Sequence, residues 1–415
     1  MIQRQIQPHI RLALGDTPAI FLNGARQTGK STLVHSLIAA GHPATYFSFD
    51  DLTVLRSART DPQGFVAGLP RFVALDEVQR VPEILLPIKA AIDSDRSGSI
   101  GRFLLIGSAN ILLLPNLADS LAGRMEIFTL YGLAETEIEP RARECSWIEA
   151  AFSGNVSDCL PKTPLQSVLP LEERLCRSGF PEVLGRTQAS RRAAWFSSYI
   201  STMLERDVRD LARIDSVAHL PNVLSLCAAR TSSILNFSEF SRTTQLPQTT
   251  LKRYMSLLTM LFFITELPAW SVNFGKRLTK APKLYVADTG LAAYLLGADA
   301  SRLRENRMLF GQLLETFVVM ELKKQNSWLE TPVRFFHLHA QSGLEIDIIL
   351  ENLRGEIVAI EVKSTSSVSA NDTKSLRTFA ALQADKLKAG ILLYQGERIV
   401  PLGEKLWAVP MSSLL

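Results

Sequence analysis

A glycine-rich phosphate-binding pattern stands directly after the first apolar run of the chain. The run Ala19–Leu22 leads into Gly24-Ala25-Arg26-Gln27-Thr28-Gly29-Lys30-Ser31, which is followed by Thr32. This is the complete pattern G-x-x-x-x-G-K-[ST], in which backbone N–H groups surround phosphate oxygens at the start of a helix. Lys30 would reach the β and γ phosphates of ATP or ADP, and Ser31 would bind Mg²⁺. A glycine turn without a nucleotide is the alternative, but a strand precedes the pattern and a helical segment follows it, as nucleotide binding requires.

A second apolar run ends in two carboxylates. Phe72–Leu75 is followed by Asp76 and Glu77. Asp76 would hold the magnesium ion through water, and Glu77 would polarise the attacking water molecule. An acidic pair at a strand end is weak evidence alone, but together with the glycine-rich pattern it predicts ATP hydrolysis.

Two later segments supply further candidates for the same site. The run Phe103–Ile106 ends in Gly107-Ser108-Ala109-Asn110, which would place Ser108, or as the weaker candidate Asn110, beside the γ phosphate. A strand-end hydroxyl with local partners is the alternative interpretation. Arg124 ends the segment Ser120-Leu121-Ala122-Gly123-Arg124 and could reach a phosphate in its own subunit or in a neighbour's. It could equally be an ordinary surface arginine.

The apolar runs of the first 140 residues alternate with helical patterns, which is typical of parallel α/β units. The runs are Ala19–Leu22, Thr45–Phe49, Phe72–Leu75, Phe103–Ile106 and Glu126–Leu130. Unbroken apolar runs of this length suit strands that are buried on both faces of a sheet. We therefore predict an α/β fold with an N-terminal parallel sheet.

Composition limits the class of protein. The chain has 415 residues, of which 47% are hydrophobic and 21% charged, as in ordinary globular proteins of two or three domains. The net charge of +4 is too small to indicate nucleic-acid binding by itself. Its four cysteines form no C-x-x-C pair, and its apolar stretches are too short to span a membrane. We expect a cytoplasmic protein that does not bind membranes.

The middle of the chain changes character. Residues 138–172 carry several prolines among polar residues, and we interpret them as a linker or loop-rich seam. A short helix is predicted from Phe237, a second from Gln248 to about Leu261, and then a strand over Phe262–Leu267. The second helix would have one apolar face, composed of Leu251, Tyr254, Leu258 and Leu261.

This order of elements is that of a winged helix, with Lys276, Arg277, Lys280 and Lys283 near its turn. Between residues 237 and 297, seven Lys and Arg stand against three Asp and Glu, an excess that equals the net charge of the whole chain. One interpretation is DNA docking, with the second helix in the major groove. The other is a spacer between protein domains.

Four polar residues in apolar surroundings mark the last hundred residues. Glu315 lies on a predicted helix over 309–325, Asp347 in the run Glu345–Leu350, and Glu361 and Lys363 in the run Val358–Val362 and just beyond. This order resembles the PD-(D/E)XK nuclease core. The resemblance implies that Asp347 and Glu361 bind a second divalent cation, that Glu315 completes its shell through water, and that Lys363 positions the nucleophilic water. Ile346 replaces the usual proline before Asp347, so the resemblance implies the fold more strongly than the cleavage. His337 and His339 could be ligands, but we interpret them as solvent-facing.

Taken in order, these motifs resemble those of bacterial and archaeal AAA+ ATPases that carry a DUF4143-type C-terminal region. The resemblance includes Gly179-Phe180-Pro181-Glu182, Tyr199 with Arg206-Asp207, and the segment Lys283–Gly290. It implies a AAA+ core, assembly of identical subunits into a ring or hexamer, and a C-terminal domain of restriction-endonuclease-like fold.

The predicted organisation has four segments. They are a AAA+ P-loop core (1–140), a linker with a helical part (141–235), a winged-helix-like segment (236–300) and a nuclease-like domain (301–415). The predicted function is an oligomeric, Mg²⁺-dependent ATPase that binds or processes DNA. An ATPase switch, or a protein remodeller, with an inactive C-terminal binding module is the alternative. The absence of a clear aromatic-apolar-glycine pore loop in residues 51–70 counts against the remodeller.

Overall fold

The chain folds into two compact units, each assembled from three separate stretches of sequence. The computed structural model describes residues 2–96, 98–109, 121–140, 146–160, 169–207 and 218–414. Unit 1 comprises residues 1–133, 179–221 and 255–263, and unit 2 comprises residues 134–178, 222–254 and 264–415. The units do not coincide with the four predicted segments, because the middle of the chain contributes to both.

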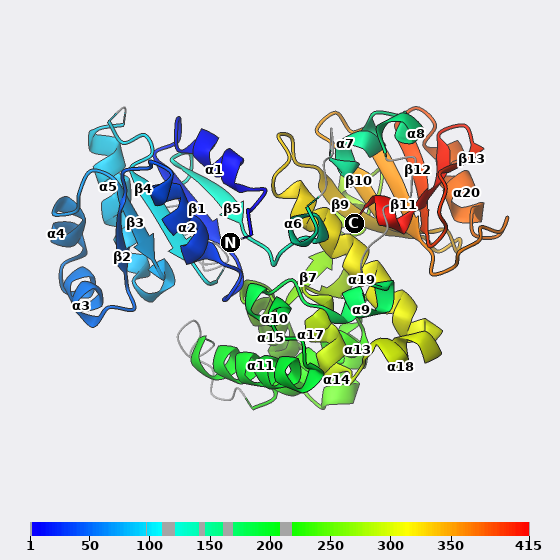
Figure 1. The fold of residues 1–415 in the computed structure, drawn as a ribbon, viewed down its shortest axis with the longest axis horizontal. Coiled ribbons are helices and arrows are strands. Elements are labelled where there is room, and N and C mark those ends of the chain that lie inside the picture. The colour runs from blue at the N-terminus through cyan, green and yellow to red at the C-terminus, as the bar shows by residue number, and fades with distance from the viewer. Residues whose placement is uncertain are drawn as a thin grey trace. The chain divides into compact units, whose positions relative to one another are not determined.

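Unit 1 contains a five-stranded parallel sheet. Its strands are β1 (Ala19–Asn23), β2 (Thr45–Ser48), β3 (Val73–Asp76), β4 (Phe103–Gly107) and β5 (Met125–Thr129). They lie in the order β2-β3-β4-β1-β5, and every neighbouring pair is parallel (Figure 1). All five predicted strands are therefore present, and their carboxyl ends share one edge of the sheet.

Helices cover both faces of this sheet. The helices α1 (Gln7–Ala13) and α2 (Lys30–Ala39) lie on one side, and α3 (Leu52–Thr60), α4 (Pro62–Ala67) and α5 (Leu85–Ser94) lie on the other (Figure 1). One core is formed where Phe21, Leu75 and Phe103 of the strands pack with Ile88 and Ile92 of α5. Burial on both faces explains why β1, β3 and β4 have unbroken apolar sequences.

Short helices complete unit 1. Two 3₁₀ turns, η1 (Val78–Arg80) and η2 (Pro82–Ile84), connect β3 to α5, and α10 (Pro181–Leu184), α11 (Ala189–Thr202) and the π-helical turn η4 (Met203–Asp207) come from the later stretch. Throughout the described parts of the chain, no helix is long and apolar enough to cross a membrane.

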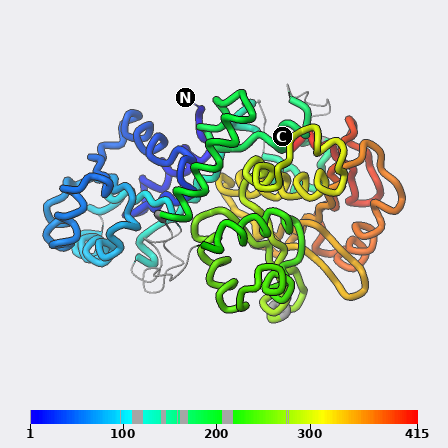
Figure 2. The backbone as a smooth tube through the Cα atoms, turned by 90° about the horizontal axis from the view of Figure 1, so that it is seen from below, coloured from blue at the N-terminus to red at the C-terminus, as the bar shows by residue number. Residues whose placement is uncertain are grey.

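Unit 2 contains a six-stranded mixed sheet in the order β13-β14-β12-β11-β10-β9. The strands are β9 (Arg334–His339), β10 (Glu345–Glu351), β11 (Ile357–Val362), β12 (Leu387–Tyr394), β13 (Val400–Gly403) and β14 (Leu406–Pro410). The helices α19 (Arg307–Asn326) and α20 (Lys374–Leu382) pack with this sheet, whose strands are orange to red in Figure 2. The predicted helix over 309–325 and the runs Glu345–Leu350 and Val358–Val362 correspond to α19, β10 and β11.

The middle of the chain contributes a three-stranded antiparallel sheet to unit 2. The elements run α13 (Leu220–Ala229), β6 (Ser233–Ile234), α14 (Phe237–Thr244), α15 (Gln248–Met260), β7 (Ile264–Leu267), α16 (Phe274–Thr279) and β8 (Lys283–Val286). Two of these helices, α13 and α15, have residues in both units. The strands lie in the order β6-β8-β7. The four predicted core residues of the second helix, Leu251, Tyr254, Leu258 and Leu261, are all buried. Two further helices, α17 (Thr289–Leu295) and α18 (Ala300–Glu305), precede α19.

The predicted linker over 138–172 is instead partly helical and contributes to the core. It contains the end of α6 (Glu135–Ile138), α7 (Trp147–Phe152), α8 (Val156–Cys159) and the start of α9 (Leu171–Cys176). Trp147 is fully buried, and its Nε1 donates to Ser413 Oγ at 3.1 Å. Ser146 and Glu149 form a capping box that starts α7. The linker interpretation is wrong there because it relied on the prolines and did not take into account the capping box or the apolar residues that follow it.

Two of the four basic residues predicted around the wing, Arg277 and Lys283, lie inside unit 2. The guanidinium of Arg277 is buried, and its Nη2 lies 2.8 Å from Glu351 Oε2. Trp270 Nε1 donates to the same oxygen at 2.9 Å. Lys283 is also an internal cation, whereas Lys280 is exposed. The side chain of Lys276 lies outside the described residues.

Candidate nucleotide-binding and hydrolysis site

The glycine-rich loop connects β1 to α2, and two of its glycines are required by the backbone. Gly24 has φ of +145°, and a Cβ added there would lie 2.2 Å from the carbonyl oxygen of Leu130. Gly29 has φ of +93° and is the residue before the first turn of α2. Thr28 Oγ1 donates to the carbonyl oxygen of Ala25 at 2.9 Å, which closes the loop. The loop thus leads into the amino terminus of a helix, where partial positive charge favours phosphate.

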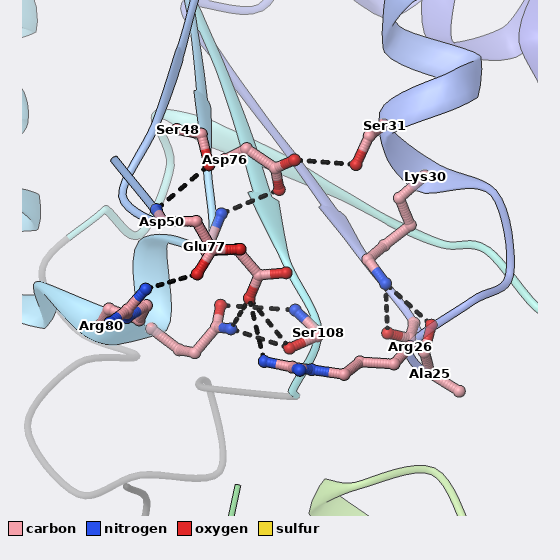
Figure 3. A network of polar contacts seen from close by, with 12 residues as sticks. Ala25, Arg26, Lys30, Ser31, Ser48, Asp50, Asp76, Glu77, Arg80 and Ser108 are labelled. Atoms are coloured by element: carbon pink, nitrogen blue, oxygen red, sulfur yellow. Dashed lines mark hydrogen bonds and ion pairs between the residues drawn. The ribbon is translucent and has the colours of Figure 1, made fainter. Parts of the chain in front are cut away.

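Lys30 is buried at the first position of α2. Its Nζ donates to the carbonyl oxygens of Gly24 at 2.9 Å and Ala25 at 2.8 Å (Figure 3). The ammonium is therefore held against the loop by two of the loop's own carbonyl groups. This position agrees with the predicted phosphate-binding role of Lys30.

Ser31 and Asp76 meet across the loop as a pair of oxygen ligands. Ser31 Oγ donates to Asp76 Oδ2 at 2.8 Å, and the backbone N–H of Glu77 donates to Asp76 Oδ1 at 2.8 Å. The hydroxyl of Tyr46 also donates to Asp76, and burial raises the pKa of this phenol further above its usual value. Hydroxyl and carboxylate oxygens are the ligands that Mg²⁺ prefers, so this pair fits the ion. Tyr46 is a contact that the sequence analysis missed.

Glu77 lies in a network of polar side chains at the end of β3. Gln79 Nε2 donates to the Glu77 carboxylate and, at 2.8 Å, to Ser108 Oγ, which itself donates to Glu77 Oε2 at 3.2 Å (Figure 3). Arg26 Nη2 lies 3.9 Å from the same oxygen. Glu77 has φ of +59°, a left-handed conformation that non-glycine residues adopt rarely and most often at functional sites.

This network brings together Glu77, Ser108 and Arg26, three residues of the predicted site. It adds Gln79, which the sequence analysis missed. The sequence feature that could have indicated Gln79 is its position two residues after Glu77. In the structure it lies on the 3₁₀ turn that follows the strand. Asn110 lies outside the described residues.

Arg124 lies at the opposite edge of the sheet. It directly precedes β5, whose first residue pairs with Ala19, whereas the loop follows Asn23 at the other end of β1. Its Nε is 2.5 Å from Asp93 Oδ1, and its Nη2 is 3.0 Å from Asp93 Oδ2. Arg124 is therefore not beside the phosphate loop of its own chain.

A cavity of about 390 Å³ opens beside the loop. Its lining includes Arg4, Thr28, Gly29, Thr32, Leu133 and Pro181. Arg4 Nη1 donates to the carbonyl oxygen of Thr28 at 2.8 Å, and Nη2 donates to that of Tyr131 at 2.8 Å. A mixed apolar and polar cavity of this size is typical of small-molecule sites. The sequence analysis did not predict this cavity.

The polar residues predicted in the C-terminal domain do gather, but around a lysine. Lys283 Nζ lies 2.6 Å from Glu315 Oε1 and 3.3 Å from Asp347 Oδ1, and Lys363 Nζ lies 3.3 Å from Glu361 Oε2. Burial, and then the charge of Asp347, raise the pKa of Glu315 to about 7 and that of Glu361 to about 8.

Among the residues that the structure describes, no three His, Cys, Asp or Glu side chains lie together as ligands of one metal ion. The set of Glu315, Asp347 and Glu361 predicted for a second cation is therefore not assembled as a metal site here. The physical reason is the ammonium of Lys283, which already binds two of the three carboxylates.

Both histidines of β9 were predicted to face solvent, and His337 does not. His337 is buried, and its Nε2 lies 3.2 Å from the carbonyl oxygen of Ala281. Burial lowers the pKa of His337 to about 4, so this ring is neutral at physiological pH. His339 is 53% exposed and pairs with Glu345, so only His339 faces solvent as predicted.

A P-loop strand and helix, an acidic strand end and a parallel five-stranded sheet define a nucleotide-binding ATPase-like domain. Family models agree: residues 16–139 match a model described as AAA domain. Residues 169–302 match a domain of unknown function, DUF8612, and residues 310–414 match DUF4143. The chain therefore contains an AAA domain followed at its C-terminal end by a DUF4143 domain, as the motifs predict.

Relatives add no activity to this assignment. An uncharacterized protein of Mycobacterium tuberculosis is 29% identical over 413 residues, covering 100% of this chain and 84% of its own length. A Walker-type ATPase of Pyrococcus abyssi aligns with 71% of this chain and 96% of its own, at 15% identity and a TM-score of 0.42. The ORC2 protein of Aeropyrum pernix in its ADPNP and ADP complexes aligns with 73% of this chain and 93% of its own length, at 15% identity and a TM-score of 0.29.

Proposed function

We propose that this chain is a Mg²⁺-dependent ATPase. The observation that carries the proposal is the contact of Ser31 with Asp76, with Lys30 preceding Ser31 on the phosphate loop and Glu77 following Asp76. Backbone N–H groups of the loop and the ammonium of Lys30 would bind the phosphates, and the cavity beside Gly29 would take the base. Ser31 and Asp76 would hold Mg²⁺, which neutralises charge on the phosphates when it is bound.

Glu77 would act as the base that orients and activates the attacking water. Gln79 and Ser108 hold its carboxylate, so they would set the direction in which the free oxygen points. Arg26 is the cation that faces the same carboxylate, and it would help to bind the γ phosphate. Ser108 was predicted to lie beside the γ phosphate. In this arrangement it would also position the attacking water, because its hydroxyl holds the Glu77 carboxylate.

The direct test is phosphate release from ATP by the purified full-length protein. We expect turnover with Mg²⁺, and loss of that turnover when EDTA removes the ion. Ser31→Ala should lower turnover at limiting Mg²⁺ and should be partly rescued at high Mg²⁺, because one ligand of the ion is lost while Asp76 remains. Turnover that is insensitive to both EDTA and Ser31→Ala would contradict the proposal.

We further propose that the ATPase assembles as a ring of identical subunits. The support is the position of Arg124, which lies across the sheet from its own phosphate loop, so that a phosphate contact by this residue would be with the site of a neighbouring subunit. In such a contact Arg124 would exchange Asp93 for a phosphate. Of the two roles predicted for Arg124, we therefore propose the one in a neighbouring subunit.

DNA contact by α15 is a second proposed function. The observation that favours it is the exposed face of this helix, which carries Gln248, Thr249, Lys252, Arg253 and Ser256. Polar and basic side chains on one helix face suit a major groove and its phosphates. Cleavage is not part of the proposal, because the ammonium of Lys283 lies between two of the carboxylates that would bind its metal.

A double variant tests this contact. Lys252→Ala with Arg253→Ala should weaken binding to duplex DNA by at least about tenfold and should lower the slope of log affinity against log salt by roughly two. Fluorescence anisotropy at several salt concentrations measures both. Arg11→Ala with Arg56→Ala, which removes the same charge from exposed positions in unit 1, is the matched control. Equal losses in both variants, or no DNA binding by the unchanged chain, would favour a protein client.

A further inference from the structure

An internal lysine lies where the C-terminal domain would need its metal ion. Lys283 is the first residue of β8, far in sequence from the predicted nuclease residues, and its side chain is only 14% exposed. Its Nζ is 2.6 Å from Glu315 Oε1 on α19 and 3.3 Å from Asp347 Oδ1 on β10. One ammonium thus bridges carboxylates from a helix and a strand of the nuclease-like domain.

Each of these two carboxylates also accepts a further hydrogen bond. Tyr285 follows Lys283 by two residues on β8, so both side chains lie on one face of the strand, and its hydroxyl donates to Glu315 Oε1 at 2.6 Å. The backbone N–H of Val362 donates to Asp347 Oδ2 at 3.0 Å. Glu315 Oε1 therefore receives two donors, and each oxygen of Asp347 receives one.

Two ammonium groups already lie against the carboxylates of the predicted metal site. Lys283 and Lys363 bring two positive charges to the three carboxylates of Glu315, Asp347 and Glu361. This is the same charge that one divalent cation would supply. Burial strengthens such pairs, and burying a second cation beside the first would add repulsion and the cost of its dehydration.

The distances also leave no room for a metal ion between Glu315 and Asp347. A magnesium ion needs oxygens at about 2.1 Å, so an ion shared by Glu315 and Asp347 would require the space that Lys283 Nζ fills. The Oε2 of the third carboxylate, Glu361, lies 3.3 Å from a second ammonium, that of Lys363.

We infer that Lys283 is the permanent cation of this acidic centre, and that the C-terminal domain consequently holds neither Mg²⁺ nor Mn²⁺ there. The ammonium joins β8 of the three-stranded sheet to α19 and β10 of the nuclease-like domain. It occupies the position where a metal ion would bind the two carboxylates. The domain then serves as a binding module and not as a metal-dependent nuclease. This inference concerns unit 2 alone and does not depend on ATP hydrolysis by unit 1.

Manganese binding to the full-length, nucleotide-free protein tests the inference. The electron paramagnetic resonance signal of free Mn²⁺ gives the number of ions bound to the unchanged chain, to Asp347→Asn and to Lys283→Ala. We expect the unchanged chain and Asp347→Asn to bind equally, since Asp347 holds no ion. Lys283→Ala should gain one Mn²⁺ per chain, and the double variant Lys283→Ala with Asp347→Asn should lose it again.

The matched control is Lys280→Ala, which removes an exposed lysine three residues away and should gain no ion. Circular dichroism establishes that each variant is folded. Binding by the unchanged chain that Asp347→Asn abolishes would overturn the inference, and this comparison does not require Lys283→Ala to fold. A folded Lys283→Ala that binds no additional Mn²⁺ would also overturn it, because Lys283 would then not be what excludes the ion.

Discussion

Glu77→Gln should lower the rate of ATP hydrolysis by at least about 100-fold while ATP still binds, which is the range expected when a general base is lost. The amide of glutamine can still contact Gln79 and Ser108, so the end of β3 should keep its conformation. What it lacks is the negative charge that draws a proton from the attacking water. Phosphate release measures turnover, and equilibrium binding of a fluorescent ATP analogue measures affinity, which should change less than about threefold.

A nearby glutamate supplies the control for this variant. Glu83 is exposed on η2, six residues after Glu77, and Glu83→Gln should leave both turnover and affinity unchanged. Equal turnover by Glu77→Gln and the unchanged chain would remove Glu77 from its proposed role. A parallel loss of affinity and turnover would instead indicate that Glu77 supports the loop and does not activate water.

The fold of unit 1 could be predicted because its three central strands, β1, β3 and β4, are buried on both faces and are apolar over most of their length. The edge strands β2 and β5 are more exposed and were predicted from their position in the alternation of strands and helices. The residues of the nucleotide site were equally visible, because a phosphate loop needs glycine at fixed positions and its ligands stand at strand ends. Gly24 shows why the spacing is rigid: a side chain there would collide with the carbonyl of Leu130.

The contacts that the sequence did not reveal join residues far apart along the chain. Arg277 and Lys283 were interpreted as basic surface near a turn, but their partners are Glu351, Glu315 and Asp347, which follow tens of residues later. A charged residue can be buried only when such a partner is present, and the sequence near the residue does not show which distant residue will be that partner.

The cavity beside the phosphate loop was missed for the same reason. Its lining combines Arg4 and Thr28 with Pro181, which follows Thr28 by 153 residues in the sequence. The family resemblance quoted the segment around Pro181, but only the folded chain shows that this segment lies against the loop.

Lys30→Ala should weaken ATP binding by at least about 100-fold and abolish turnover at ordinary ATP concentrations. Each charge-assisted hydrogen bond contributes roughly 1.5–3 kcal/mol, so the loss of two bonds from the ammonium to phosphate oxygens corresponds to a factor of about 10² to 10⁴ in affinity. The same variant removes the contacts of Lys30 Nζ with the carbonyl oxygens of Gly24 and Ala25, so the loop also loses an internal brace. Both effects act in the same direction, since a loosened loop presents its N–H groups less well to phosphate.

The measurement for Lys30→Ala separates binding from folding. Titration with a fluorescent ATP analogue gives affinity, and thermal unfolding with and without ATP shows whether the nucleotide still stabilises the protein, as any ligand of the native state must. The unchanged chain should be stabilised by ATP and Mg²⁺, whereas Lys30→Ala should unfold at the same temperature with and without them. Lys386→Ala, at an exposed position in unit 2, should retain the full stabilisation. If Lys30→Ala were stabilised by ATP as strongly as the unchanged chain, the nucleotide would bind elsewhere, and both the loop assignment and the ATPase built on it would fail together.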